Sequence, residues 1–189
     1  MKILHFPVIL CPAFLCMVFA LGSCSAFGPK SDDFGKRTLG TRMDDGRIKS
    51  LAKRNIRAAH PDLDKAHLGV ASFNSTLLIV GQVPSDEMIN LASKAVEGMR
   101  NVAQVHNELE VAGPTSLLAR TNDGWLTTKI KTSMAASSMT DANRIKVVTE
   151  NGVVYLLGLL TRDEADAAVA LTRKTFGVQK IVKVFEYIN

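Results

Sequence analysis

The sequence is poor in aromatic residues and cysteine, and it carries little net charge. Tryptophan occurs once, as Trp125, and aromatic side chains make up 6% of the 189 residues. The formal net charge of +5 is far below the charge density of a protein that neutralises a nucleic-acid backbone, so we expect no nucleic-acid partner. The chain is nevertheless 47% apolar and 22% charged, which excludes disordered and collagen-like classes.

Signatures of catalysis and of cofactor binding are also missing. No glycine-rich phosphate loop follows an expected strand, and no nucleophile elbow is present. His60, His67 and His106 lack the i, i+4 spacing of a helical metal pair, so we expect no metal site. The adjacent carboxylates of Asp163 and Glu164 would point apart on a helix, and a helix start explains them. We therefore expect a protein that is not an enzyme, with no cofactor and no small-molecule substrate.

Long apolar sequence is confined to the amino terminus. Lys2 carries the only formal charge before the third cysteine, and two prolines interrupt the apolar run, which is typical of a secretory signal rather than a permanent membrane helix. The run closes with Leu21-Gly22-Ser23-Cys24, which resembles a bacterial lipobox. We expect residues 1–23 to be a lipoprotein signal peptide and Cys24 to be lipidated. A plain signal peptide that leaves this cysteine as a free thiol is the alternative.

The cysteine pattern and the residues after Cys24 indicate the cellular location of the protein. Cys11 and Cys16 would leave with the signal, and a lone thiol in an exported chain is unusual unless a lipid caps it. Under the sorting rule of enterobacteria-like cells, Ser25 after Cys24 favours the outer membrane, with the protein facing the periplasm. Residues 24–43 show no apolar period, so we expect them to form a flexible tether.

The rest of the chain contains an internal duplication. Asp45-Gly46-Arg47-Ile48 recurs 78 residues later as Asp123-Gly124-Trp125-Leu126. The apolar segment at residues 78–83 recurs 77 residues later at 155–160. Such self-similarity indicates two copies of one structural unit. We expect a first domain at 44–112, a linker at 113–120 and a second domain at 121–189.

Each unit is expected to be an α+β fold in which a three-stranded mixed sheet packs against two helices, in the order helix, strand, strand, helix, strand. In the second copy, Asn122 or Asp123 can cap the first helix, and Asn-Gly suits a tight hairpin. A helix that crosses between the last two strands makes them parallel. The expected elements are a helix from Trp125 to about Ser137, strands at 144–149 and 153–160, a helix from Thr161 and a strand at 180–188.

The repeated unit resembles the BON domain (bacterial OsmY and nodulation). The resemblance is carried by Val80-Gly81 and Leu157-Gly158 in the strand cores and by the stretches 121–129 and 148–152. Two such units behind a lipobox and a tether resemble dual-BON outer-membrane lipoproteins of Gram-negative bacteria. The resemblance implies a non-enzymatic protein that recognises anionic phospholipid through its second BON unit and supports outer-membrane integrity.

The first helix of the second unit is the expected lipid-binding element. At about 100° per residue, Leu126, Ile130 and Met134 face the sheet. A separate flank is formed by Trp125, Lys129, Thr132 and Ala136. On this flank the indole can enter the headgroup region while the ammonium meets a phosphate. The first copy has Arg47 in place of the tryptophan, and residues 44–112 carry a net charge of −1 against +2 for residues 121–189.

Two alternatives stand beside the lipid-binding interpretation. Trp125 can instead close a contact between the two domains. The whole chain can also be a periplasmic adaptor that binds an envelope protein or a peptidoglycan-associated partner, with lipid serving only as the anchor. Binding to lipid vesicles separates the membrane-binding hypothesis from the adaptor hypothesis.

Cys24→Ala is expected to release the protein from the membrane fraction, because the variant lacks the thiol that lipidation requires. Cell fractionation measures the release, and mass spectrometry of the wild-type protein should find a lipidated cysteine as the mature amino terminus. An unmodified start, or a variant that still fractionates with membranes, would contradict lipidation.

Overall fold

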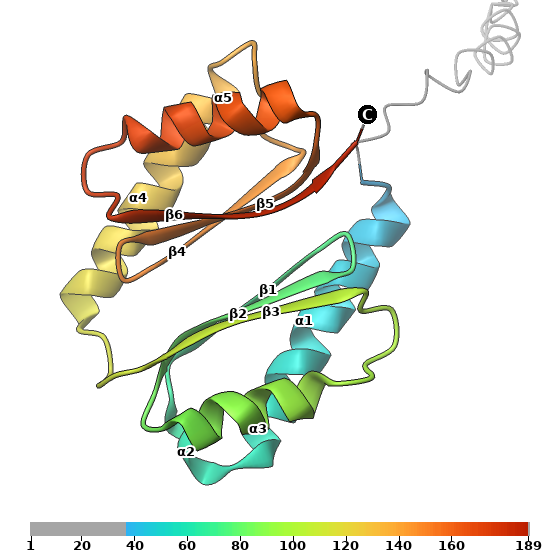
Figure 1. Ribbon diagram of the computed structural model, residues 1–189, viewed down its shortest axis with the longest axis vertical. Coiled ribbons are helices and arrows are strands. Elements are labelled where there is room, and N and C mark those ends of the chain that lie inside the picture. Colours follow the sequence, from blue (N-terminus) through green and yellow to red (C-terminus); the bar gives the residue numbers. More distant parts are fainter. Residues whose placement is uncertain (1–36, 189) are drawn as a thin grey trace, which may run out of the picture. The chain divides into compact units, whose positions relative to one another are not determined.

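The computed structural model describes residues 37–188, so the expected signal peptide, Cys24 and most of the expected tether lie outside the described residues. The described chain forms two modules with similar element order (Figure 1). The first consists of α1 (Leu39–Ala59), α2 (Pro61–Lys65), β1 (Leu68–Phe73), β2 (Thr76–Val83), α3 (Asp86–Val96) and β3 (Gln104–Val111). The second consists of α4 (Leu117–Ala135), β4 (Ile145–Glu150), β5 (Val153–Leu160), α5 (Arg162–Arg173) and β6 (Lys180–Tyr187).

The expected order of helix, strand, strand, helix, strand is confirmed in both modules. In each sheet the first two strands are antiparallel and the last two are parallel, with the central strand between them. The first module adds only the short helix α2, whose amino end is capped by His60 Nδ1, which accepts the Asp62 N–H. Within residues 37–188, no helix is both long and apolar enough to cross a bilayer.

Two helices begin earlier than the sequence led us to expect. α1 starts at Leu39, where the Thr38 hydroxyl accepts the Thr41 N–H, so the last residues of the expected tether are helical. α4 starts at Leu117 behind a Ser116 cap, so the expected linker at 113–120 already ends in helix. Neither Asn122 nor Asp123 caps the helix, because Ser116 supplies the acceptor two turns earlier.

Asp123 instead holds the hairpin of its own module. It lies on the inner face of α4 and is only 6% exposed. One carboxylate oxygen accepts the N–H of Asn151 at 2.7 Å, and the other accepts the N–H of Gly152 at 2.8 Å. These two amides belong to the turn between β4 and β5, where both residues have positive φ. A turn of this shape leaves amides unpaired within the hairpin, and the helix satisfies them.

The first module repeats this arrangement with Asp45. Its carboxylate accepts the N–H groups of Asn74 at 3.0 Å and Ser75 at 3.3 Å, which form the turn between β1 and β2. The Ser72 hydroxyl at 2.8 Å and the Arg37 guanidinium at 3.0 Å donate to the same carboxylate. Burial acts to raise the pKa of Asp45, but these four donors together hold it below the ordinary value of 3.8.

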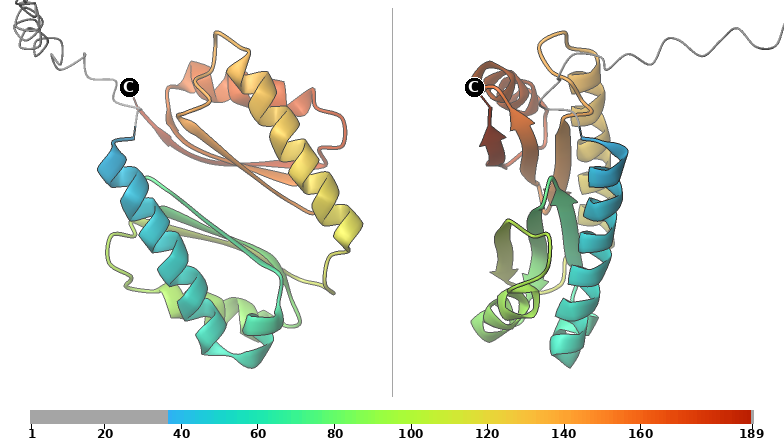
Figure 2. Two further views of the ribbon diagram at one scale, coloured as in Figure 1. Left: turned by 180° about the vertical axis from the view of Figure 1, so that it is seen from behind. Right: turned by 90° about the vertical axis from the view of Figure 1, so that its right-hand side faces the viewer.

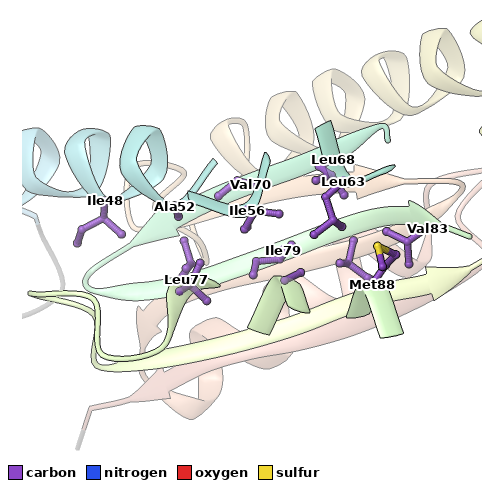
Figure 3. Close-up of a cluster of buried hydrophobic side chains, with 13 residues drawn as sticks. Ile48, Ala52, Ile56, Leu63, Leu68, Val70, Leu77, Ile79, Val83 and Met88 are labelled. Carbon is purple, nitrogen blue, oxygen red and sulfur yellow. The ribbon is translucent and has the colours of Figure 1, made fainter. Parts of the chain in front are cut away.

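Each sheet buries one face against its own helices. In the first module, α1 contributes Ile48, Ala52 and Ile56, which pack against alternate residues of the strands (Figure 3). The second module has an equivalent core, in which Ile130 and Met134 of α4 pack against β4 and β5. This alternation follows from the strand period of two, which sends every second side chain to the helical face.

The opposite faces of the two sheets pack against each other. The layers therefore run helices, sheet, sheet, helices (Figures 1 and 2). β2 is buried along its whole length, because one half of its side chains faces the helices and the other half faces the second module. The buried residues of this shared core are Ala71, Phe73, Leu78, Val80, Tyr155, Leu157 and Val184.

Polar contacts rim this apolar interface. Glu186 accepts from the Thr76 hydroxyl at 2.6 Å, and Gln82 donates to Glu150 at 3.0 Å. Burial, together with nearby glutamates, raises the pKa of Tyr155 to about 12, so this interfacial phenol stays neutral at physiological pH. An apolar centre with a satisfied polar rim is typical of a specific interface.

Asp45→Asn is expected to lower the free energy of unfolding at pH 7 by about 2 kcal/mol, since hydrogen bonds to a charged acceptor are worth roughly 1.5–3 kcal/mol. The depressed pKa makes the Asp45 contribution complete above about pH 4 and lets it disappear as the pH falls through the folded-state pKa, below 3.8. Urea unfolding at pH 7 and at pH 3 measures both effects. The difference in free energy of unfolding between the wild-type protein and the variant should therefore be smaller at pH 3 than at pH 7.

Asp44→Asn is the matched control, because Asp44 is the exposed neighbour of the buried carboxylate and lies 3.8 Å from Arg47 in a surface ion pair. Its effect at pH 7 should stay within about 0.5 kcal/mol. Equal losses in the two variants, or a difference for Asp45→Asn that is the same at both pH values, would contradict the buried clamp.

Candidate functional site

α4 has two faces with different roles. Leu126, Ile130 and Met134 are buried, as expected from their spacing. Trp125 is 52% exposed, and it takes no part in the shared core between the sheets. The domain-contact alternative for the tryptophan is therefore wrong, because the modules join through their sheets and leave this side of α4 in solvent.

Lys129 and Trp125 form a pair on the exposed side. The Lys129 Nζ lies 4.7 Å from the centroid of the indole ring, within the range of a cation–π interaction. The two residues are four apart, so they lie one above the other along the helix. The arrangement places a positive charge at an exposed aromatic surface, with both groups accessible.

The other two expected site residues are exposed but lie farther along α4. The Thr132 hydroxyl donates to the Thr128 carbonyl at 3.0 Å, which occupies its hydrogen within the helix. Ala136 is the C-cap residue, with its N–H bonded to carbonyls of the last turn. The structure thus brings Trp125 and Lys129 into direct contact, whereas Thr132 and Ala136 extend the same flank without touching the ring.

Two leucines that the sequence reasoning missed extend the flank in the other direction. Leu117 and Leu118 are 79% and 80% exposed in the first turn of α4. Leu118 precedes Trp125 by seven residues, two helical turns, and so shares its face. The available signal was Ser116, an N-cap residue directly before two leucines, but Asn122 and Asp123 offered a competing helix start.

Phe176 is the third residue that was missed, and it is 87% exposed in the loop between α5 and β6. This loop runs beside α4 in both figures that show the whole fold (Figures 1 and 2). Gly177 lets the loop lie close to α4. Its φ is +98°, and a Cβ at this residue would lie 3.1 Å from Leu126 Cδ2 on α4. An aromatic residue directly before a glycine, ahead of the expected last strand, was the available sequence signal.

We call Leu117, Leu118, Trp125, Lys129 and Phe176 the α4 surface. The first module lacks the aromatic part of this surface, because Arg47 lies at the position that corresponds to Trp125, and Gly40 replaces Leu118. The Arg47 side chain is 78% exposed and pairs with Asp44. Exposed apolar side chains occur on α1 as well, including Leu39 at the position that corresponds to Leu117, so the feature that distinguishes the second module at this place is an exposed indole beside a cation.

The remaining sequence candidates have structural roles or lie apart. His67 Nε2 is 3.8 Å from a Glu150 oxygen, and His106 lies on β3. The expected helix start at Asp163 and Glu164 is confirmed, since Glu164 and Thr161 form a reciprocal capping box. Glu164 also binds the Arg144 guanidinium at 2.6 Å.

The duplicated fold defines a two-module α+β protein, and the α4 surface lies on its second module. The BON domain model matches residues 44–113 and 122–189. The chain therefore belongs to the BON domain family, and the resemblance seen in the sequence is confirmed.

Curated relatives match this sequence over most of their length. The outer membrane lipoprotein DolP of Haemophilus influenzae is 33% identical over 153 residues, covering 81% of this chain and 79% of the relative. The 21 kDa hemolysin of Actinobacillus pleuropneumoniae is 32% identical over 153 residues, with coverage of 81% and 79%. The osmotically-inducible protein Y of Escherichia coli is 25% identical over 152 residues, with coverage of 79% and 75%.

Neighbouring substitutions on α4 should separate folding from surface chemistry. Leu126→Glu is expected to unfold the second module, because a buried unpaired carboxylate costs several kcal/mol. Trp125→Glu should leave the thermal unfolding midpoint within a few degrees of wild type, since its side chain is half in solvent. Circular dichroism during heating measures both. A large loss of stability in Trp125→Glu would show that the indole is structural.

Proposed function

We propose that this chain is an outer-membrane lipoprotein that faces the periplasm, is anchored through Cys24, and binds anionic phospholipid through the α4 surface, thereby supporting outer-membrane integrity. The observation that carries the proposal is the exposed Trp125 with Lys129 stacked on its ring. The family membership and the name of the Haemophilus influenzae relative support the cellular location.

The apolar part of the α4 surface supports partition into a bilayer interface. Leu118, Trp125 and Phe176 project from two adjacent elements of a module whose core is already complete without them. Apolar area removed from water contributes about 25 cal/mol per Å², so each side chain that enters the headgroup region adds on the order of 1 kcal/mol. An indole and a phenyl ring are suited to this depth because aromatic rings favour the membrane interface.

The charged part of the surface supports a preference for anionic lipid. Lys129 lies on the indole, and the exposed residues Arg173 and Lys174 come shortly before Phe176 in the chain. Basic groups at an anionic leaflet contribute about 1 kcal/mol each, and salt screens this term. An anchor at Cys24 keeps the surface at a high effective concentration near the bilayer, so a modest intrinsic affinity is sufficient.

Vesicle co-sedimentation with residues 34–189 tests the proposal, because this segment includes both modules and omits the anchor cysteine. Vesicles of phosphatidylethanolamine with phosphatidylglycerol should bind the wild-type protein, and vesicles of phosphatidylcholine should bind it much less. Trp125→Glu should weaken binding at least tenfold, since it removes the indole and adds a negative charge. Phe176→Ser and Lys129→Glu should each weaken binding by a smaller factor, and the effect of Lys129→Glu should fade at high salt.

Met43→Glu is the matched control, because it places the same carboxylate at an exposed apolar position on α1 of the other module. Its vesicle binding should equal that of the wild-type protein. A folded Trp125→Glu protein that binds vesicles normally would move the lipid surface elsewhere. Absence of vesicle binding by the wild-type protein would favour the adaptor hypothesis, in which lipid serves only as the anchor.

A further inference from the structure

A basic hollow lies where α1, α4 and β4 meet, and no residue of the α4 surface lines it. Its volume is about 560 Å³, within the range of roughly 300–1,000 Å³ that is usual for small-ligand pockets. Both modules line it, because the amino end of α1 and the carboxyl-terminal half of α4 lie along the same edge of the stacked sheets (Figure 2). Its cationic lining residues are Arg37, Arg42, Lys131 and Lys146.

The charge of this basic hollow is unbalanced. No carboxylate is among its lining residues, and only Arg37 is committed to an acid, through its contact with Asp45. The ion pairs found within residues 37–188 include neither Arg42, Lys131 nor Lys146. Arg42, Lys131 and Lys146 therefore line the hollow without an ion pair to a carboxylate of the described chain, and the acid that acts on Lys146, Asp45, is already paired with Arg37.

Lys146 is the most informative of these cations. It is half-buried, and its Nζ donates to the Ser72 carbonyl of the other module at 3.0 Å, so two of its three N–H donors remain available. Burial lowers the pKa of Lys146, the like charges of Arg37, Lys49 and Lys131 lower it further, and the carboxylate of Asp45 acts in the opposite direction without reversing the shift. Holding like charges together at one place is unfavourable, and a bound anion would relieve it.

The adjoining carboxyl end of α4 disfavours an anion, but two of its last carbonyls are already hydrogen-bonded. Ala135 lines the hollow in the last turn of the helix, where free carbonyls would repel an anion. The Met134 carbonyl accepts the Thr140 hydroxyl at 2.7 Å, and the Thr132 carbonyl accepts the Ala136 N–H at 3.0 Å. Thr132 and Asn143 contribute further polar side chains to the lining.

We propose that the basic hollow is a binding site for a phosphate group, held by Arg42, Lys131 and Lys146 at the junction of the two modules. The site is distinct from Trp125 and does not depend on lipid binding by the α4 surface. A guanidinium with two ammonium groups matches the charge and the acceptor geometry of a phosphate. Either a free phosphate compound or the headgroup of a phospholipid can supply this chemistry.

Isothermal titration of the full chain, held in a nonionic detergent, with inorganic phosphate tests the site. We expect saturable binding at a stoichiometry of one. An Arg42→Gln/Lys131→Gln double variant should bind at least tenfold more weakly, and both residues are exposed enough for the fold to tolerate the change. Arg54→Gln/Lys180→Gln is the matched control, since it removes one exposed arginine and one exposed lysine that do not line the hollow.

Three results would overturn the site: no saturable phosphate binding by the wild-type protein, unchanged binding by the double variant, or an equal loss in the control variant. Trp125→Glu should bind phosphate normally, so failure of the lipid proposal and failure of this one are distinguishable. Competition with soluble dihexanoylphosphatidylglycerol identifies the source within the proposal. If the soluble lipid displaces bound phosphate, the site is assigned to a lipid headgroup. If it does not displace phosphate, the site is assigned to a free phosphate compound.

Discussion

In each module, a carboxylate on the long helix accepts hydrogen bonds from the backbone of a hairpin turn, and the rest of the module depends on this interaction. Asp45 and Asp123 lie on the inner faces of α1 and α4, where each accepts two backbone N–H groups from the turn between the first two strands. The bond fixes the hairpin against the long helix and so sets which side chains of that helix face inward. The same rotation of α4 about its axis decides which of its side chains are exposed, and Trp125 is one of them.

The same residues explain why the duplication is visible in the sequence. The interaction needs two features together: a carboxylate at this position of the helix and a left-handed backbone conformation in the turn. Asn74 and Asn151 supply the second feature, with the same φ of 49°. Asparagine tolerates this conformation better than most residues. The residues after the aspartate are less restricted, and the pair Arg47 and Trp125 shows that the two copies differ where the helix faces solvent.

Much of the fold followed from local sequence, because strand alternation, the Asn-Gly turn and the cap at Thr161 each act over a few residues. The early start of α4 could not be predicted in this way. Aspartate is a common helix cap, and only the turn at residues 151–152, distant in sequence, shows that Asp123 binds backbone amides there instead. Packing between the sheets was also missed. The continuous apolar run from Leu77 to Val80 was its signal, because a strand buried on both faces loses its alternation. Trp125 and Lys129 were found by helical period alone, whereas Phe176 and the basic hollow depend on contacts between elements distant in sequence.

The shared core between the sheets also governs orientation. Side chains from both sheets interdigitate there, and close-packed interiors resist sliding, so the first module cannot swivel about the second as a domain on a flexible hinge would. When α4 rests on any surface, the direction in which the first module points is already determined. Exposed residues of α1, such as Leu51, are then presented at one fixed angle to that surface. A partner that meets the protein from the periplasmic side would find the same face on every copy.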